Sequence, residues 1–85
     1  MTNKQWEKYA DKGRAAASKK LQAEPELFKK YPIRKWEAEE EKALKNIERR
    51  QKSGYYENNP EAALKDWTDL YVARIICYNA ANRME

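Results

Sequence analysis

Histidine is absent from this 85-residue sequence, and cysteine occurs once, at Cys77. The lack of histidine removes the commonest general base and the commonest transition-metal ligand. A single cysteine excludes an internal disulfide and a Cys/His zinc site, which favours a reduced, cytoplasmic setting. No run of about 20 apolar residues is present, so we expect no membrane-spanning helix. The first residues also lack the apolar core of a secretory signal.

The residues that remain give little support to catalysis. Ser18 and Ser53 are the only serines, and each stands beside a lysine in a stretch typical of charged helix surface. There is no glycine-rich phosphate loop, no CxxC pattern and no EF-hand pattern. Because no histidine is available to activate it, Cys77 is expected to be a small core residue and not a nucleophile. We therefore predict no catalytic residues, no metal ligands and no cofactor.

Glycine and proline are scarce, with two and three copies, whereas Ala, Glu, Lys, Leu and Arg abound. This composition favours helix throughout, interrupted at Pro25, Pro32, Gly54 and Pro60. We predict an all-α fold, a small three-helix bundle in a single domain of residues 1–85. Its parts are long helices at about 3–22, 32–53 and 60–83 and a short helical turn near 25–30.

The apolar patterns indicate how these helices pack. The stripe of the first helix is built from small residues around Gly13, so a neighbouring helix is expected to approach closely there, unless Gly13 interrupts the helix. The segment GYYENN, at 54–59, is predicted to be a loop. The last helix has the broadest apolar face and should be the central element. We expect 36–85 to form a helical hairpin core, with 1–35 packed on it or held as a looser arm.

Some side chains break these patterns, and each allows two interpretations. Glu40 and Arg74 fall inside apolar stripes, where each extends to the edge of the bundle or the two form a partly buried ion pair. Val72 and Ile76 lie on the back of the last helix. The first helix covers them, or they form an interface with a second chain.

Charge is distributed unevenly along the sequence. Residues 1–35 hold ten Lys+Arg and four acidic residues, a net charge of +6, whereas 36–59 and 60–85 each come to −1. Four lysines share one stripe of the first helix, and more basic residues surround the turn at Tyr31. The predicted site for nucleic acid or an acidic partner is Lys4, Lys8, Lys12, Lys19, Lys29, Lys30, Tyr31, Arg34 and Lys35. A smaller group of the same kind is Arg49, Arg50, Lys52, Tyr55 and Tyr56.

These observations predict a small, basic, non-enzymatic binding protein that docks on a larger macromolecular partner. Inhibition or recruitment would follow from steric occupancy, as for the many small accessory proteins of this size and charge, including phage-encoded factors that block a host complex. One alternative is sequence-independent RNA or DNA binding by the same lysines, with RNA favoured because no DNA-binding motif is visible. Another is a self-associating structural protein. Membrane association is not expected, because the face opposite the lysines is rich in Ala.

Overall fold

The computed structural model describes the backbone of residues 3–83 and the side chains of residues 4–80. Within that range 91% of residues are helical and no β-strand occurs, which confirms the all-α prediction. Five helices are found there, so the described chain contains more than a plain three-helix bundle. The short helical turn predicted near 25–30 is present as one of them, and the helical turn at Tyr55–Asn58 was not predicted. The five helices are α1 (Asn3–Ala23), α2 (Leu27–Lys30), α3 (Ile33–Ser53), α4 (Tyr55–Asn58) and α5 (Pro60–Arg83).

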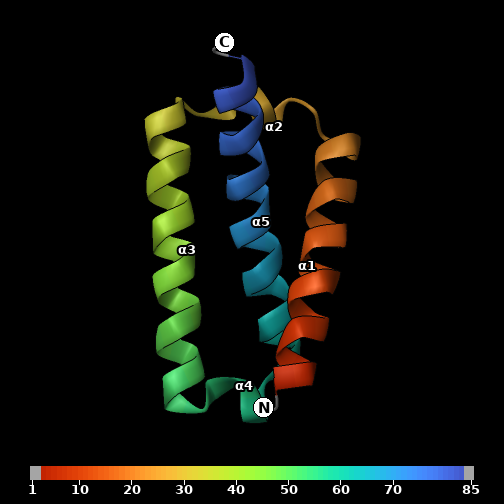
Figure 1. Cartoon of the computed structure of the whole chain (residues 1–85), viewed down its shortest axis with the longest axis vertical. Coiled ribbons are helices and arrows are strands. Elements are labelled where there is room, and N and C mark those ends of the chain that lie inside the picture. Colours follow the sequence, from red (N-terminus) through yellow and green to blue (C-terminus); the bar gives the residue numbers. More distant parts are fainter. Residues whose placement is uncertain (1–2, 84–85) are drawn as a thin grey trace.

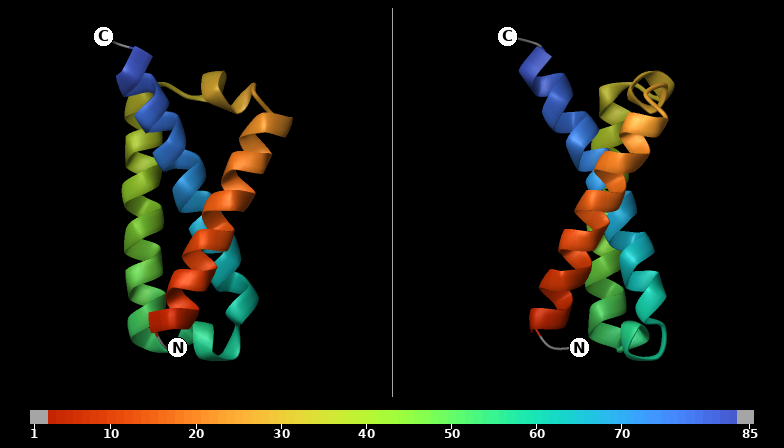
Figure 2. Two further views of the ribbon diagram at one scale, coloured as in Figure 1. Left: turned by 45° about the vertical axis from the view of Figure 1, so that its right-hand side comes forward. Right: turned by 90° about the vertical axis from the view of Figure 1, so that its right-hand side faces the viewer.

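The three long helices are arranged around α5, which lies between α1 and α3 (Figure 1). α3 and α5 run antiparallel and are joined by the single turn of α4. α1 packs along the other side of α5, and the two helices cross as seen in the right-hand view of Figure 2. The described part of the molecule measures 40 × 22 × 20 Å. The central position predicted for the last helix is therefore confirmed.

The crossing of α1 and α5 depends on Gly13, where α1 continues without interruption. A Cβ atom built on Gly13 would lie 2.5 Å from the Cβ of Trp67 and 2.9 Å from its backbone carbonyl carbon. Real Cβ atoms do not approach other heavy atoms that closely, so hydrogen is the largest substituent that fits. The close approach expected from the small residues of this helix is confirmed.

The connection between α3 and α5 differs from the predicted loop. Gly54 ends α3 in the left-handed region, at φ 75°, and its N–H contacts the carbonyls of Arg50 and Gln51. The chain then forms one further helical turn, α4, in place of the predicted loop at 54–59. Its Tyr56 is 2% exposed, so burial of an aromatic side chain accompanies this turn.

The core has two parts along the length of α5. Near the end of the molecule that carries α2, a cluster of buried side chains joins α1, α3 and α5; its members are Ala17, Leu21, Trp36, Val72, Ala73 and Ile76. Near α4, aromatic rings succeed one another. The centroid of Trp6 lies 5.5 Å from that of Tyr56 and 5.4 Å from that of Trp67, which stacks on Tyr71 at 5.9 Å. These rings attach the first turns of α1 to α4 and α5.

Candidate functional site

The predicted lysine stripe lies on the outer face of α1. Lys4, Lys8, Lys12 and Lys19 are all exposed, while Gly13, Ala17 and Leu21 of the same helix are buried. At 1.5 Å per residue, the distance from Lys4 to Lys19 along the helix axis is about 22 Å. The stripe is therefore a rigid row of cations on one side of the molecule.

The second basic group surrounds the junction of α2 and α3, at the end of the molecule where α1 terminates (Figure 1). Lys29, Lys30, Arg34 and Lys35 are exposed there. Tyr31, between them, is only half-buried. Its ring lies 5.1 Å from the ring of Trp36, and the Nζ atoms of Lys35 and Lys30 lie 4.1 and 5.2 Å from its centroid.

These two groups have in common that their charges are not neutralised inside the chain. Among the side chains of residues 4–80, the ion pairs join Lys45 to Glu41, Arg50 to Asp66 and Arg74 to Glu40, and none of them uses a cation of either group. We refer to the following eight residues as the basic surface: Lys4, Lys8, Lys12, Lys19, Lys29, Lys30, Arg34 and Lys35. Tyr31 is left out of this surface because its ring already packs against Trp36.

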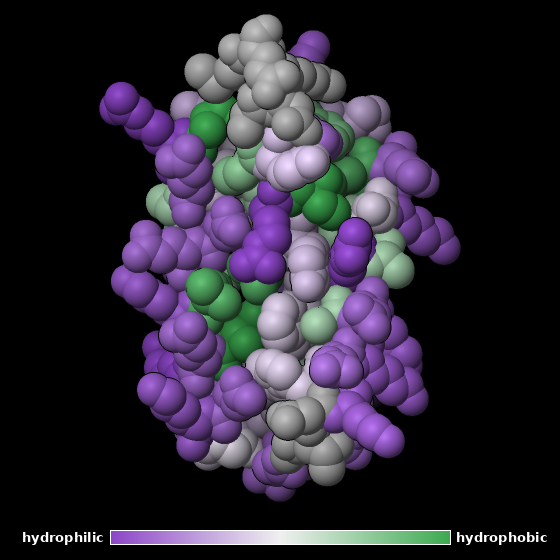
Figure 3. All heavy atoms as spheres, viewed as in Figure 1, coloured by the Kyte–Doolittle hydropathy of each residue, from purple (hydrophilic) through white to green (hydrophobic). Residues whose placement is uncertain are grey.

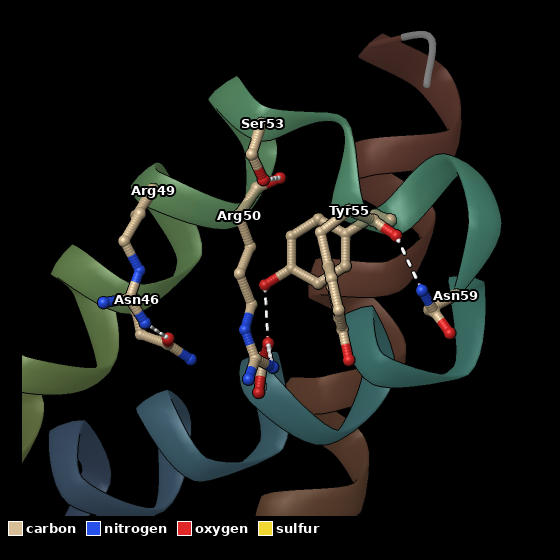
Figure 4. Close-up of polar contacts among 8 residues, drawn as sticks. Asn46, Arg49, Arg50, Ser53, Tyr55 and Asn59 are labelled. Carbon is tan, nitrogen blue, oxygen red and sulfur yellow. Dashed lines mark hydrogen bonds and ion pairs between the residues drawn. The ribbon is translucent and has the colours of Figure 1, made fainter.

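The smaller predicted group near α4 is divided by the structure. Arg49 and Lys52 are exposed, and Arg49 donates a hydrogen bond to Asn46 at 2.7 Å. Tyr55 is also exposed, with the guanidinium carbon of Arg50 4.6 Å from its ring centroid. Arg50, however, extends toward α5, as the close-up in Figure 4 shows, and its side chain is 32% exposed. Arg50 and the buried Tyr56 are therefore part of the packing between helices.

Arg50 and Tyr56 meet at Asp66, and these three residues form what we term the Asp66 cluster. The hydroxyl of Tyr56 donates to Oδ2 of Asp66 at 2.6 Å, and Nη1 of Arg50 donates to the same oxygen at 2.8 Å. The side chain of Asp66 is only 8% exposed. Burial, and then the hydrogen bond to Asp66, raise the pKa of Tyr56, and the hydrogen bond to Asp66 raises the pKa of Arg50. The cluster links α3, α4 and α5.

Sequence reasoning missed this cluster, although one signal was available. Asp66 stands three residues after Ala63 and four before Leu70, both of which are buried on α5. A carboxylate at that position of an apolar stripe requires polar partners from neighbouring elements, because burying it alone is costly. The partners themselves, Arg50 and Tyr56, are not identifiable from spacing.

Glu40 and Arg74 form an ion pair between α3 and α5. Nε of Arg74 donates to Oε1 of Glu40 at 3.0 Å. The side chain of Arg74 is 43% exposed and that of Glu40 is 29% exposed. The guanidinium of Arg74 also lies 5.5 Å from the ring centroid of Tyr71. Of the two interpretations, the partly buried pair is the one that the structure shows. On the face seen in Figure 3, a less polar strip along α5 separates hydrophilic margins on α1 and α3.

Three further residues singled out by the sequence lie in or beside the core. Val72 and Ile76 are 7% and 1% exposed, packed with Ala17 and Leu21 of α1. Neither side chain is exposed enough to contact a second chain. The structure therefore favours the interpretation in which the first helix covers Val72 and Ile76 over the one in which they form an interface. Cys77 is partly buried against the same cluster. Burial, and then the negative charges of Glu40 and Glu37, raise the pKa of its thiol.

Within residues 3–83, no helix is long and apolar enough to cross a membrane, and no group of three or more Cys, Asp or Glu side chains is placed to hold a metal ion. Comparison of the chain with protein-family models, curated proteins and solved structures finds no match. What the chain binds has to be inferred from its own surfaces.

Proposed function

We propose that this chain is a non-catalytic binding protein that docks, through the basic surface, on an acidic face of a larger protein or protein complex. The observation that carries the proposal is a set of eight exposed cations that have no ion-pair partner in the described chain. Unpaired cations in a fixed geometry attract an acidic partner and orient it. A rigid molecule 40 Å long that is held in this way blocks or recruits by occupying the site.

The packing of the tyrosines favours a protein partner over a single-stranded nucleic acid. Base stacking requires a free aromatic face. Tyr56 is buried, and the ring of Tyr31 packs on Trp36 with Lys35 also beside it. Tyr55 is the exposed ring that remains of the three that the sequence placed beside basic residues.

Contact with a nucleic-acid backbone is a second candidate, which the spacing of the lysines supports. Lys4, Lys8 and Lys12 follow one another at four-residue steps, about 6 Å along the axis of α1. Each strand of a duplex carries one phosphate per nucleotide on a path that winds around the axis, so an evenly spaced row of lysines can contact several phosphates where α1 crosses the backbone. Lysine point charges suit this contact, which would be independent of sequence.

Fluorescence anisotropy with charge-matched probes tests both candidates. Labelled oligoglutamate, single-stranded RNA and duplex DNA of equal charge are titrated at several salt concentrations. We expect oligoglutamate to bind, and a Lys8/Lys12/Lys19→Gln variant to lose at least about tenfold in affinity. A Lys45/Lys52/Lys65→Gln variant removes the same charge elsewhere and should bind nearly as the parent protein does.

The salt dependence separates the two candidates. Tighter binding of nucleic acid than of oligoglutamate at every salt concentration, with a log–log slope of several units, would replace the protein partner by a nucleic acid. Equal losses in the two lysine variants would show that net charge alone is responsible. Absence of binding to all probes at low salt would reject both candidates.

A further inference from the structure

A groove with a volume of about 890 Å³ lies along the seam between α3 and α5. On α3 it extends from Trp36 to Arg49, about 20 Å along the helix axis. On α5 it is lined from Asp66 to Ala73. Lys20 of α1 and Leu27 of α2 border it near the end of the molecule that carries α2. Its length corresponds to three or four turns of an α-helix.

The lining contains small and apolar side chains. Its floor is formed by Trp36, Val72 and Ala73, whose side chains are almost completely buried. Ala43 of α3 and Leu27 of α2 are only partly buried and border this floor. Small residues between two helices let the backbone of a third approach to the usual interaxial distance of 8–10 Å. The buried indole N–H of Trp36 has no hydrogen-bond acceptor in the part of the chain that the structure describes. The apolar contact that the groove offers to a helix face therefore comes mainly from Ala38, Ala43 and Leu27, which keep exposed surface above a floor of nearly buried side chains.

The charges of the lining are unbalanced once pairing within the chain is considered. Glu41 is paired with Lys45, and Asp66 is paired with Arg50, so these two acids are already neutralised. Two lining acids remain, Glu39 and Asp69. Against them stand four lining cations that form no ion pair among the described side chains: Lys20, Lys30, Lys42 and Arg49. This excess of positive charge selects an acidic occupant.

We propose that the groove binds an acidic amphipathic helix supplied by a protein partner. Apolar side chains at i, i+3 or i+4 and i+7 of that helix contact the groove, and its Asp or Glu residues face the unpaired cations. Both walls are helices whose backbone groups are bonded internally, so an extended peptide would find no backbone partners there, whereas a helix satisfies its own. The contact extends the proposed docking function to a surface distinct from the stripe on α1.

A second copy of this chain is a poorer occupant. The face of α1 that remains exposed carries Lys4, Lys8, Lys12 and Lys19, which have the same sign as the excess charge of the groove. Like charges brought together at an interface oppose association. Self-association is therefore kept as an outcome of the test.

The test uses the full chain and a designed probe. The probe is a labelled, capped peptide of about 14 residues, with Leu on one helical face and Glu on both flanks. A peptide of identical composition, scrambled so that the Leu residues share no face, is the matched control. Binding is measured by anisotropy and located by NMR, from the indole N–H of Trp36 and the amides of Ala43, Val72 and Ala73.

We expect the patterned probe to bind at least about tenfold more tightly than the scrambled one, with shift changes at those four residues. Lys42→Glu and, separately, Arg49→Glu should weaken binding about tenfold, whereas Lys52→Glu, on the same helix but outside the groove, should not. A Lys8/Lys12/Lys19→Gln variant should retain binding of the probe. Circular dichroism of each variant verifies that it is folded.

Other outcomes would reject the groove as a helix site. One is equal affinity for the two peptides. Another is a pattern of shift changes along α1 that Lys8/Lys12/Lys19→Gln abolishes, in which case docking by the basic surface stands and the groove proposal fails. The third is a mass that rises with protein concentration without probe, accompanied by shifts at Ala43 and Ala73, which would identify a second copy as the occupant.

Discussion

Asp66 places a carboxylate inside the contact between α3, α4 and α5, where a charge without partners would oppose folding. Tyr56 and Arg50 both donate to the same oxygen, at 2.6 and 2.8 Å. Short hydrogen bonds to a charged acceptor are the stronger kind. The Asp66 cluster therefore converts a costly buried group into a specific connection between three elements.

Removing the hydroxyl of Tyr56 should weaken that connection. We expect Tyr56→Phe to lower the free energy of unfolding by about 1–3 kcal/mol, since Asp66 loses a buried donor while the ring is retained. Chemical denaturation at neutral pH measures the change. Tyr55→Phe is the matched control, because Tyr55 is exposed and does not contact Asp66. Equal effects of the two substitutions would contradict the role assigned to Tyr56.

The same cluster predicts a loss of stability in alkaline solution. Burial and the hydrogen bond to Asp66 raise the pKa of Tyr56 above its ordinary value of 10.0. The unfolded chain therefore releases this proton first, and the stability contributed by the protonated hydroxyl is present below pH 10 and lost above it. The stability difference between the parent protein and Tyr56→Phe should shrink as pH rises beyond 10. A difference independent of pH would show that the hydroxyl is not involved.

Cys77 should react slowly with thiol reagents. Burial and the charges of Glu40 and Glu37 raise the pKa of the thiol, which lowers the fraction of reactive thiolate at neutral pH. We expect a colorimetric thiol reagent to modify the folded protein much more slowly than the protein in denaturant. Equal rates in the two states would mean that Cys77 is accessible and ionises normally.

At the scale of elements, a substitution of Gly13 at the crossing of α1 and α5 compares the effect of side-chain packing with that of intrinsic helix propensity. Alanine favours a helix over glycine by about 1 kcal/mol, so propensity alone predicts that Gly13→Ala stabilises the protein. The new methyl group would meet Trp67 at 2.5 Å and force the helices apart. We expect a net loss of about 1–3 kcal/mol, measured by thermal denaturation. A gain in stability would show that α1 can move away from α5 at little cost.

The ion pair between Glu40 and Arg74 connects α3 and α5 at their partly exposed edge. A double-mutant cycle with Glu40→Gln and Arg74→Met isolates the interaction between the two side chains. Because both remain in contact with solvent, we expect a coupling free energy of about 0.5–1 kcal/mol. Coupling near zero would indicate that the pair does not help to set the register of the two helices.

At the scale of the whole molecule, the basic surface, the groove and the core all depend on the central position of α5. α1 and α3 each pack along α5, so its middle is shielded on two sides. Leu70, Ala73 and Ile76 are almost completely buried there. Their amides should exchange with solvent more slowly than those of α2 or of the exposed first turn of α1 at Lys4 and Gln5. Hydrogen-exchange NMR measures this order. Faster exchange in the middle of α5 than in α3 would contradict its central role.

The helices and the distribution of charge follow from the sequence alone, because both depend on residues that are near neighbours along the chain. The stop at Gly54 and the start at Pro60 follow from local backbone geometry. The outward lysine stripe follows from helical periodicity, as does the small-residue stretch around Gly13 that meets α5.

Which side chains from distant parts of the chain contact one another follows from the packing of the helices and not from local sequence. α4 was predicted to be a loop, and its turn accompanies the burial of Tyr56 against α3 and α5. The hydrogen bond from Arg50 to Asp66 is likewise a property of the assembled helices, as is the tilted packing against Trp36 of the Tyr31 ring, which the sequence predicted to be free. Periodicity shows which face of a helix is buried. The residue opposite each position depends on crossing angle and register, which are set jointly by all the packed faces.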